Sequence, residues 1–494
     1  NMILINFKKY NYICKQDNQK LHLMKYKLEK LEIPVENPFE NCKLDREKYA
    51  EILKAIITEY ENGLVLAING KWGTGKTTFV EMWKAYLELD NFHTLYFNAW
   101  EYDFISDPLI GLLGELKKID IYKKAEDSLM SVINTACKIA LKAAPSMAKG
   151  VIKRYVGEDV VDILGASMEE AAEILKKEIE NYEKQKNSLA QFRERLGKYV
   201  DEVCDKKPLV FIIDELDRCN PYYAVKVLER IKHLFNIPNV IFVLSIDKRQ
   251  LCNSIRGYYG SNLIDADEYL KRFIDIEYVL PDPDIERYCK YLFDYYGFNS
   301  FFYQLKSTYH RTDDLESLFI IATSIFKFKK TTLRQIEKIF TNVYLALVMF
   351  DDKHNICADL LCLLTYFRIC EYDFYEKIVS KQYTVQELVI QIEKIIPRQI
   401  FDLGILEYRN NNRFFYCTIA YLLKSYITTY IGDDKENLLS VQGEEKILTF
   451  KVKIMHEKQM IETIEWTENN LRILPLDAIT KNINLLSNFQ SDIK

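Results

Sequence analysis

The apolar positions in the first 280 residues fall into two patterns that alternate along the chain. Short runs rich in apolar residues occur at 64–68, 94–97, 209–213, 240–244 and 274–280. Between them, apolar residues recur every three or four positions at 45–60, 79–87, 221–234 and 265–273. Such runs are typical of strands buried on both faces, and the spaced stripes are typical of amphipathic helices. Strands alternating with helices predict an α/β domain built on a parallel sheet.

The flanking sequence predicts further regions. Residues 1–40 form a polar N-terminal extension, and we expect the α/β domain to cover 41–280. Within that domain, residues 118–187 predict a helical insertion. Beyond the Pro281-Asp282-Pro283 segment the chain is mostly helical, and the low numbers of glycine (16) and proline (11) favour long helices.

The insertion contains one stretch, 129–151, that is rich in Ala, Ile, Met and Val. A membrane-spanning helix needs about 20 predominantly apolar residues. This stretch carries Lys138, Lys142, Lys149 and Pro145, so we expect no transmembrane span. An amphipathic helix in peripheral contact with a membrane or a partner protein remains an alternative, and an ordinary packed helix is favoured over it.

The segment after the first predicted strand carries a phosphate-binding pattern. Gly70, Gly75, Lys76 and Thr77 occupy the fixed positions of G-x-x-x-x-G-K-[ST]. Glycines let the loop turn tightly, so that its N–H groups form a nest for anionic oxygens at the start of a helix. Lys76 would reach the β- and γ-phosphates, and the Thr77 hydroxyl would ligate Mg²⁺. The loop residues expected to contact the nucleotide are Gly70, Trp72, Gly73, Thr74, Gly75, Lys76, Thr77 and Thr78.

A second motif follows the predicted strand 209–213. There Asp214 and Glu215 come directly after an apolar run, which is the Walker B arrangement. Ligands of open α/β sheets bind at the carboxyl ends of the strands, where Asp214 can hold Mg²⁺. Glu215 is placed to orient and deprotonate an attacking water.

Three further residues lie near predicted strand ends. Ser245 and Asp247 follow the strand 240–244, and Ser245 is a candidate for contact with the γ-phosphate or the attacking water. An ordinary turn serine is an equally good interpretation. Arg272, before the last strand, is a candidate for stabilising transition-state charge in a neighbouring subunit, with a surface ion pair as the alternative.

Weaker candidates complete the set. Arg334 begins a helix of the helical region and could reach back over the nucleotide, although a structural role is favoured. Trp100 follows the second predicted strand and is interpreted as core packing near the P-loop. Glu101 or Asp103, beside it, could contact Mg²⁺ or water.

Composition narrows the functional classes. The 494-residue chain has a formal net charge of −5, so no bulk electrostatic attraction to nucleic acid is expected. Its 11 cysteines are scattered, without a C-x-x-C motif, and the six histidines do not cluster with them. This pattern favours reduced thiols in a cytoplasmic protein over a disulfide framework or a metal site.

Together these motifs resemble those of the KAP family of P-loop NTPases. Beyond the P-loop and D-E-L-D-R-C at 214–219, the matching segments are 44–50, 97–102, 231–235 and 269–273. The tryptophan inside the P-loop and the W-E-Y at 100–102 make the resemblance specific. It covers roughly residues 38–350 without the insertion, and it says nothing about 351–494.

The resemblance implies a P-loop domain of the additional-strand, catalytic-glutamate class, related to the AAA+ and STAND groups. It implies ATP and Mg²⁺ as ligands and a helical lid, placed at 281–350, before a C-terminal helical domain at 351–494. It assigns Lys76 and Thr77 to phosphate and Mg²⁺, Asp214 to Mg²⁺, Glu215 to catalysis, and Arg272 to an arginine finger. Many family members carry transmembrane helices, which this insertion does not match, and bacterial members have been linked to phage exclusion.

The function expected from these residues is that of an ATPase, with GTP as an alternative, acting as a conformational switch. A homo-oligomer is expected, with a protein partner bound through the insertion or the C-terminal region. One alternative is a nucleotide-gated assembly scaffold with little turnover. Another is a nucleic-acid-associated motor, which the net charge disfavours.

Overall fold

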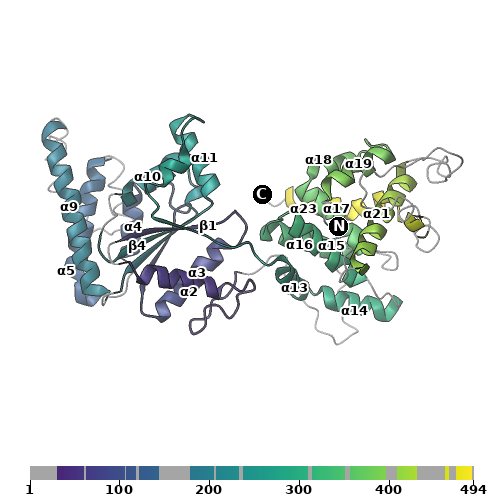
Figure 1. Cartoon of the computed structure of the whole chain (residues 1–494), viewed down its shortest axis with the longest axis horizontal. Helices are drawn as coiled ribbons and strands as arrows, with labels where there is room; N and C mark the ends of the chain where they lie inside the picture. Colours follow the sequence, from purple (N-terminus) through teal and green to yellow (C-terminus); the bar gives the residue numbers. More distant parts are fainter. Residues whose placement is uncertain are drawn as a thin grey trace. The chain divides into compact units, whose positions relative to one another are not determined.

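A computed structural model describes residues 30–60, 63–105, 107–117, 122–143, 178–204, 207–232, 237–309, 314–350, 357–396, 409–430, 462–464, 466 and 474–491 (Figure 1). The chain divides into two compact units, one from Leu31 to Pro283 and one that includes the residues from Asp284 onward. The first unit contains the sheet and the predicted phosphate-binding motifs.

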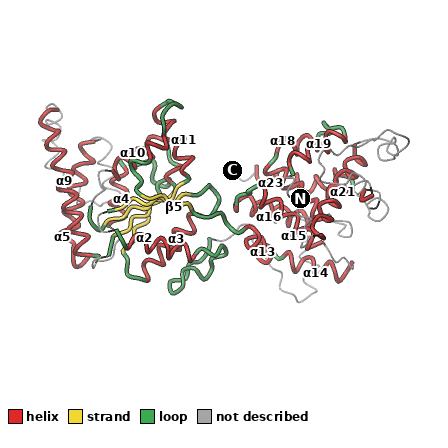
Figure 2. The backbone as a smooth tube through the Cα atoms, viewed as in Figure 1, coloured by secondary structure: helices red, strands yellow, loops and turns green. Residues whose placement is uncertain are grey.

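The sheet of the first unit has five parallel strands in the order β2-β3-β4-β1-β5 (Figure 2). The strands are β1 (Leu64–Asn69), β2 (His93–Asn98), β3 (Leu209–Asp214), β4 (Val240–Ile246) and β5 (Ile276–Val279). Its helices are α2 (Glu47–Thr58), α3 (Lys76–Leu89), α4 (Pro108–Leu116), α5 (Tyr122–Ala143), α9 (Glu178–Val203), α10 (Pro221–Lys232), α11 (Lys248–Tyr259) and α12 (Ala266–Leu270). The predicted parallel α/β fold is confirmed.

Side-chain alternation along the strands divides the apolar core between the two faces of the sheet. In β3, Val210 and Ile212 pack in the core under α2 and α3, whereas Phe211 and Ile213 pack in the core shared with α4, α5 and α9–α12. Because each face is covered by helices, β3 and β4 are apolar over 209–213 and 240–244, as the sequence predicted.

The segment before α2 also contributes to this core. Phe39 is buried and lies 6.3 Å from Phe79 of α3, between ring centroids. Leu31 and Ile33 pack against the same cluster. The compact unit therefore starts ahead of residue 41.

The region between β2 and β3 is helical in all of its described parts except short connections. It contains α4, which the apolar pattern did not predict, and the long helices α5 and α9, which lie side by side (Figure 1). Arg195 of α9 donates to Thr135 Oγ1 of α5 at 2.6 Å. Residues 144–177 of the insertion lie outside the described part. No helix that the structure describes is both long and apolar enough to cross a membrane.

The second unit is helical in the parts that the structure describes. Its helices are α13 (Ile285–Tyr296), α14 (Phe298–Tyr309), α15 (Asp314–Phe328), α16 (Leu333–Met349), α17 (Ala358–Cys370), α18 (Tyr372–Val379), α19 (Val385–Ile395), α21 (Arg409–Tyr430) and α23 (Leu476–Ser491). Helix α17 is buried from Ala358 to Phe367 and packs against α15, α16 and α18. An all-round apolar helix of this kind forms the centre of a helical core.

Two predicted elements are shorter in the structure. Strand β5 starts at Ile276 rather than residue 274, because Asp275 instead accepts a hydrogen bond from Val65 N at 2.8 Å. Helix α12 covers Ala266–Leu270 rather than 265–273, because Asp265 caps its N-terminus and Phe273 N bonds Leu270 O in a closing turn.

Candidate phosphate-binding site

The P-loop connects β1 to α3 at the carboxyl end of the sheet. Gly73 and Gly75 have φ values of 74° and 81°, a left-handed conformation that favours glycine. A Cβ on Gly70 would lie 3.3 Å from Cδ of Lys76, so side-chain bulk there would push the lysine aside. The glycine positions of the motif therefore meet real conformational and steric requirements.

Arg46, the residue before α2, holds this loop from outside. Its guanidinium donates to the carbonyl oxygens of Thr74 at 2.8 Å and Gly75 at 3.0 Å. In a trans peptide the C=O and the following N–H point in opposite directions. Holding these two carbonyls on Arg46 therefore aims the N–H groups of Gly75 and Lys76 away from it, into the loop. Arg46 is 2% exposed, and burial lowers its pKa to about 10, so it remains charged near neutral pH.

The Lys76 side chain bonds to backbone carbonyls of the P-loop itself. Its Nζ donates to the carbonyls of Gly70 and of Lys71, the second at 3.1 Å. Burial lowers the pKa of Lys76, and the nearby carboxylates of Asp217, Asp247 and Asp214 oppose that shift. Among the described residues this buried ammonium donates to these two carbonyls alone, so it is ready to exchange them for phosphate oxygens.

Three polar side chains form a row across the adjacent ends of β2, β3 and β4. Asn98 pairs in register with Asp214, and Asp214 pairs with Ser245. The alternation that buries Ile212 and Val243 under α3 places all three on the face of the sheet that carries α3. Asp214 Oδ2 accepts from the Tyr96 hydroxyl at 3.0 Å. The Ser245 hydroxyl is fully buried and has no hydrogen-bond partner among the described residues.

Glu215 lies next to this row in a strained conformation. Its φ of 61° is unusual for a residue with a side chain, and such strain is common at functional sites. The carboxylate pairs with Arg218 at 2.7 Å and accepts from Asn98 Nδ2 at 3.4 Å. Burial raises the pKa of Glu215, while the Arg218 charge lowers it.

Two aspartates fix Trp72 of the P-loop. Asp247 caps α11 and accepts from the backbone N of Trp72 at 3.1 Å, and Asp217 accepts from the indole Nε1. Burial raises the pKa of Asp217, opposed by the bond from Trp72 and by the Lys76 charge. Trp72 thus joins the P-loop to the turn after β3.

The remaining candidates lie elsewhere or have other partners. Arg272 is exposed, and no contact among the described residues joins its side chain to the P-loop. A catalytic role for Arg272 would therefore have to be exerted on the nucleotide of a second subunit. Asp103 accepts from Asn220 N at 3.2 Å, and Glu101 accepts from Asn98. Arg334 lies in the first turn of α16, in the other unit.

One interpretation was wrong. Trp100 was predicted to pack in the core, but its side chain is 50% exposed. The chain turns after β2, so that Ala99 is buried and Trp100 lies at the surface, where Arg218 sits 5.9 Å from the ring centroid.

Sequence reasoning gave no role to Arg46, Tyr96, Asn98, Asp217 and Arg218. Asn98 could have been predicted as a site residue, because it follows directly after a predicted strand, as Asp214 does. Arg46 lies in the segment 44–50 that resembles the KAP family, but its contacts do not follow from the sequence, because the partners are backbone carbonyls 28 and 29 positions away.

These residues fit a magnesium nucleotide. The described part of the chain contains no cluster of three or more His, Cys, Asp or Glu residues that could hold a metal by itself. Magnesium typically takes one or two protein oxygens together with phosphate oxygens and waters. Thr77, at the start of α3, and Asp214 could supply those protein oxygens, and the orphaned Ser245 hydroxyl lacks the partner that a phosphate or water would provide.

Comparison with known families is consistent with this geometry. The model of the KAP family P-loop domain matches residues 46–349. The chain belongs to the KAP family. This KAP protein therefore contains a nucleotide-binding P-loop NTPase domain, as the sequence motifs predicted.

Comparison with solved structures adds no further argument. The Aeropyrum pernix ORC2 protein in ADPNP–ADP complexes is 13% identical with a TM-score of 0.31, and the match covers 91% of this chain and 95% of that one. Its ADP form is 14% identical with a TM-score of 0.30, covering 93% and 96%. At these scores the likeness carries no weight. No curated protein matches the chain.

Proposed function

We propose that this KAP protein is an ATP hydrolase that works as a nucleotide-driven conformational switch. The observation that carries the proposal is the placement of Glu215. It lies one residue beyond Asp214 at the sheet edge that holds the P-loop, in a strained conformation, and its carboxylate is oriented by Asn98 and Arg218. A carboxylate fixed in this position serves as a general base for water.

Other residues of the chain bind the nucleotide and its metal ion. The P-loop N–H groups and Lys76 bind the phosphates, and Thr77 and Asp214 hold Mg²⁺, which when bound neutralises phosphate charge. Ser245 supplies a hydroxyl for the γ-phosphate or the attacking water. The biological setting that we propose, phage defence or signalling near a membrane, rests on the family resemblance alone.

The proposed switch requires two local changes at the site. Lys76 must leave the carbonyls of Gly70 and Lys71 to reach phosphate, and Glu215 must loosen its pairing with Arg218 to accept a proton from water. We propose that residues 281–350 act as the lid that responds. Helix α17 of the C-terminal region 351–494 packs against α15 and α16 of this lid, so we expect the two regions to move together. Differential contacts of this kind are what a nucleotide switch requires.

Two variants test the hydrolase proposal. Glu215→Gln should keep ATP binding and lose turnover at least about a hundredfold, the lower end for a general base. Lys76→Ala should lose both. Phosphate release and equilibrium ATP binding measure the two effects separately. Normal turnover in Glu215→Gln would contradict the assignment of the base.

A second candidate function is a nucleotide-gated scaffold with little turnover. The Arg218 pairing favours it, because a base engaged in an ion pair is a poor proton acceptor. Particle size measured with ATP or a non-hydrolysable analogue separates the two. A scaffold assembles equally with both, whereas an ATPase switch disassembles as ATP is consumed.

A further inference from the structure

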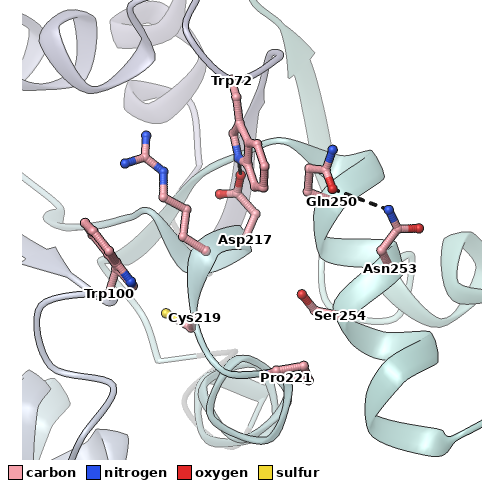
Figure 3. Close-up of a pocket in the computed structure, with 9 residues that line it drawn as sticks. Trp72, Trp100, Asp217, Cys219, Pro221, Gln250, Asn253 and Ser254 are labelled. Carbon is pink, nitrogen blue, oxygen red and sulfur yellow. Dashed lines mark hydrogen bonds between the residues drawn. The ribbon is translucent and has the colours of Figure 1, made fainter. Parts of the chain in front are cut away.

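A cavity of about 510 Å³ lies beside the P-loop, on the side of Trp72 (Figure 3). In Figure 3, Trp100 lies on one side of the cavity and the first turns of α11 on the opposite side, with Trp72 and Asp217 between them and Pro221 below. Cys219 and Arg218 also line the cavity. The α11 residues are Gln250, Asn253 and Ser254. This volume is within the range of about 300–1,000 Å³ found for small-ligand sites.

The aromatic side of the cavity is exposed but held in place. Trp72 and Trp100 are 42% and 50% exposed. The Trp72 indole donates to Asp217, and Trp100 N donates to Asn98 Oδ1 at 3.1 Å. Arg218 lies over the Trp100 ring while it pairs with Glu215. The side-chain hydrogen bond fixes the Trp72 indole, and the Arg218 guanidinium lies 5.9 Å from the centroid of the Trp100 ring. An aromatic surface that is fixed before binding loses little entropy when a ligand stacks on it.

The α11 side is polar and uncharged. Gln250 Oε1 accepts from Asn253 Nδ2 at 3.4 Å. Within the described part of the chain, the Gln250 Nε2 group and the Ser254 hydroxyl donate to no acceptor. An amide offers a donor and an acceptor side by side, which matches the edge of a heterocyclic base. An alkyl group placed there would leave these polar groups without partners.

The charges favour a neutral ligand. The carboxylate of Asp217 is buried, accepts from the Trp72 indole and lies near the charge of Lys76, and the guanidinium of Arg218 pairs with Glu215. A strongly charged ligand would find no free counter-ion among the residues that line the cavity. A flat, neutral ring with hydrogen-bonding edges satisfies the aromatic side and the amide side together.

We propose that this cavity binds a nucleobase, at a site separate from the phosphate cradle of the P-loop. Trp100 supplies the main stacking surface, and Gln250 and Asn253 contact the base edge. The base could come from a free nucleoside or nucleotide, or from an exposed single strand. This proposal does not depend on hydrolysis at Glu215.

Adenosine tests the site, because it has a base but no phosphate for the P-loop. We expect saturable adenosine binding to the full-length protein in equilibrium dialysis. Trp100→Ala should weaken it at least about fivefold, since stacking contributes about 1–3 kcal/mol per base. Trp100→Phe should keep part of the affinity. Trp466→Ala, which removes another exposed tryptophan in the other unit, is the matched control and should bind normally.

Two further measurements test whether the base site is separate from the P-loop and which kind of ligand supplies the base. Trp100→Ala should bind ATP as tightly as the unaltered chain does, because the base site is separate from the site of the P-loop nucleotide. A ten-residue oligo(dA) that binds more tightly than adenosine, with affinity falling steeply as salt rises, identifies a single strand as the source. Equal affinity for the two identifies a free nucleoside or nucleotide.

Three results would overturn the proposal. One is the absence of saturable binding by adenosine, guanosine, cytidine, uridine and oligo(dA) alike. Another is a loss of ATP affinity in Trp100→Ala as large as the loss of adenosine affinity, because the base would then belong to the nucleotide on the P-loop. The third is unchanged adenosine affinity in Trp100→Ala protein that melts at the normal temperature.

Discussion

Glu215 shows how single contacts set the chemistry of this site. Its carboxylate is pushed toward the protonated form by burial and toward the ionised form by Arg218. A general base works only when it is deprotonated, so its pKa sets the acidic limb of the pH–rate profile. The balance between burial and the Arg218 charge therefore decides the pH at which turnover begins.

Removing the Arg218 charge gives a pH-dependent prediction. Arg218→Ala leaves the burial effect unopposed by that charge, so the pKa of Glu215 rises further. The acidic limb of kcat should then move to higher pH, while Arg218→Lys, which keeps the charge, should move it less. Phosphate release between pH 5 and 9 measures both, and an unshifted limb in Arg218→Ala would show that another group controls it.

Arg46 gives a second prediction at the residue scale. Arg46→Ala removes two charge-assisted hydrogen bonds from the P-loop, each contributing about 1.5–3 kcal/mol. We expect ATP affinity to fall at least tenfold, because the Gly75 and Lys76 N–H groups lose their fixed direction. Calorimetry measures the affinity, and Arg249→Ala, an exposed arginine of the same unit, is the control. Wild-type affinity in Arg46→Ala would make Arg46 a purely structural residue.

Residues that carry chemistry through a local motif could be predicted from sequence, and residues that act through folding contacts could not. Gly75, Lys76 and Asp214 stand in short patterns whose spacing reflects their chemistry. Arg46 and Tyr96 reach their partners only after the chain has folded, across 28 and 118 positions. The exposure of Trp100 depends on the direction of one turn, which apolar content does not specify.

At the scale of elements, strands were predicted better than short helices. The buried strands are apolar on both faces, so β3 and β4 stand out from their surroundings. Helix α10 was also clear, because Asn220 Oδ1 accepts from Tyr222 N at 3.0 Å and Pro221 occupies the first turn. Helix α4 is almost wholly buried, so its apolar residues show no periodic stripe.

Helix α4 approaches β2 through a glycine, which yields a stability prediction. A Cβ on Gly111 would lie 2.7 Å from Cε2 of the buried Phe97. Gly111→Ala should therefore lower the free energy of unfolding by about 1–3 kcal/mol. In Gly197→Ala of α9 the nearest atom is Ile237 Cγ2 at 3.9 Å, so helix propensity should raise stability by up to about 1 kcal/mol.

Urea unfolding of both glycine variants measures the contrast. The two changes add the same methyl group inside a helix, so they differ only in what the methyl meets. A stabilising Gly111→Ala would show that Phe97 can move aside without cost.

At the scale of the whole molecule, the open question is whether one chain completes the site. Arg272 is exposed and makes no ion pair with a carboxylate among the described residues. The family resemblance assigns an arginine at this position to the nucleotide of a neighbouring subunit. We therefore expect activity per subunit to rise with protein concentration.

Mixing two inactive variants tests that expectation. Arg272→Ala keeps Glu215, and Glu215→Gln keeps Arg272, so mixed assemblies contain some sites with both residues. The mixture should recover a measurable fraction of ATP turnover that neither variant has alone. If mixing restores nothing, Arg272 has a structural role and no part in catalysis.

The neighbouring positions of β2 and β3 have a consequence for how this protein can diversify. The chain leaves the sheet at Asn98 and returns at Leu209 of the adjacent strand, and the register between Asn98 and Asp214 closes that detour. The hydrogen-bonded ladder between β2 and β3 keeps the site residues aligned whatever the length of the segment between the two strands. The faces of α5 and α9 that pack in the core of the sheet must be kept, whereas the outer faces of these helices are free to vary while the chemistry at the strand ends stays constant.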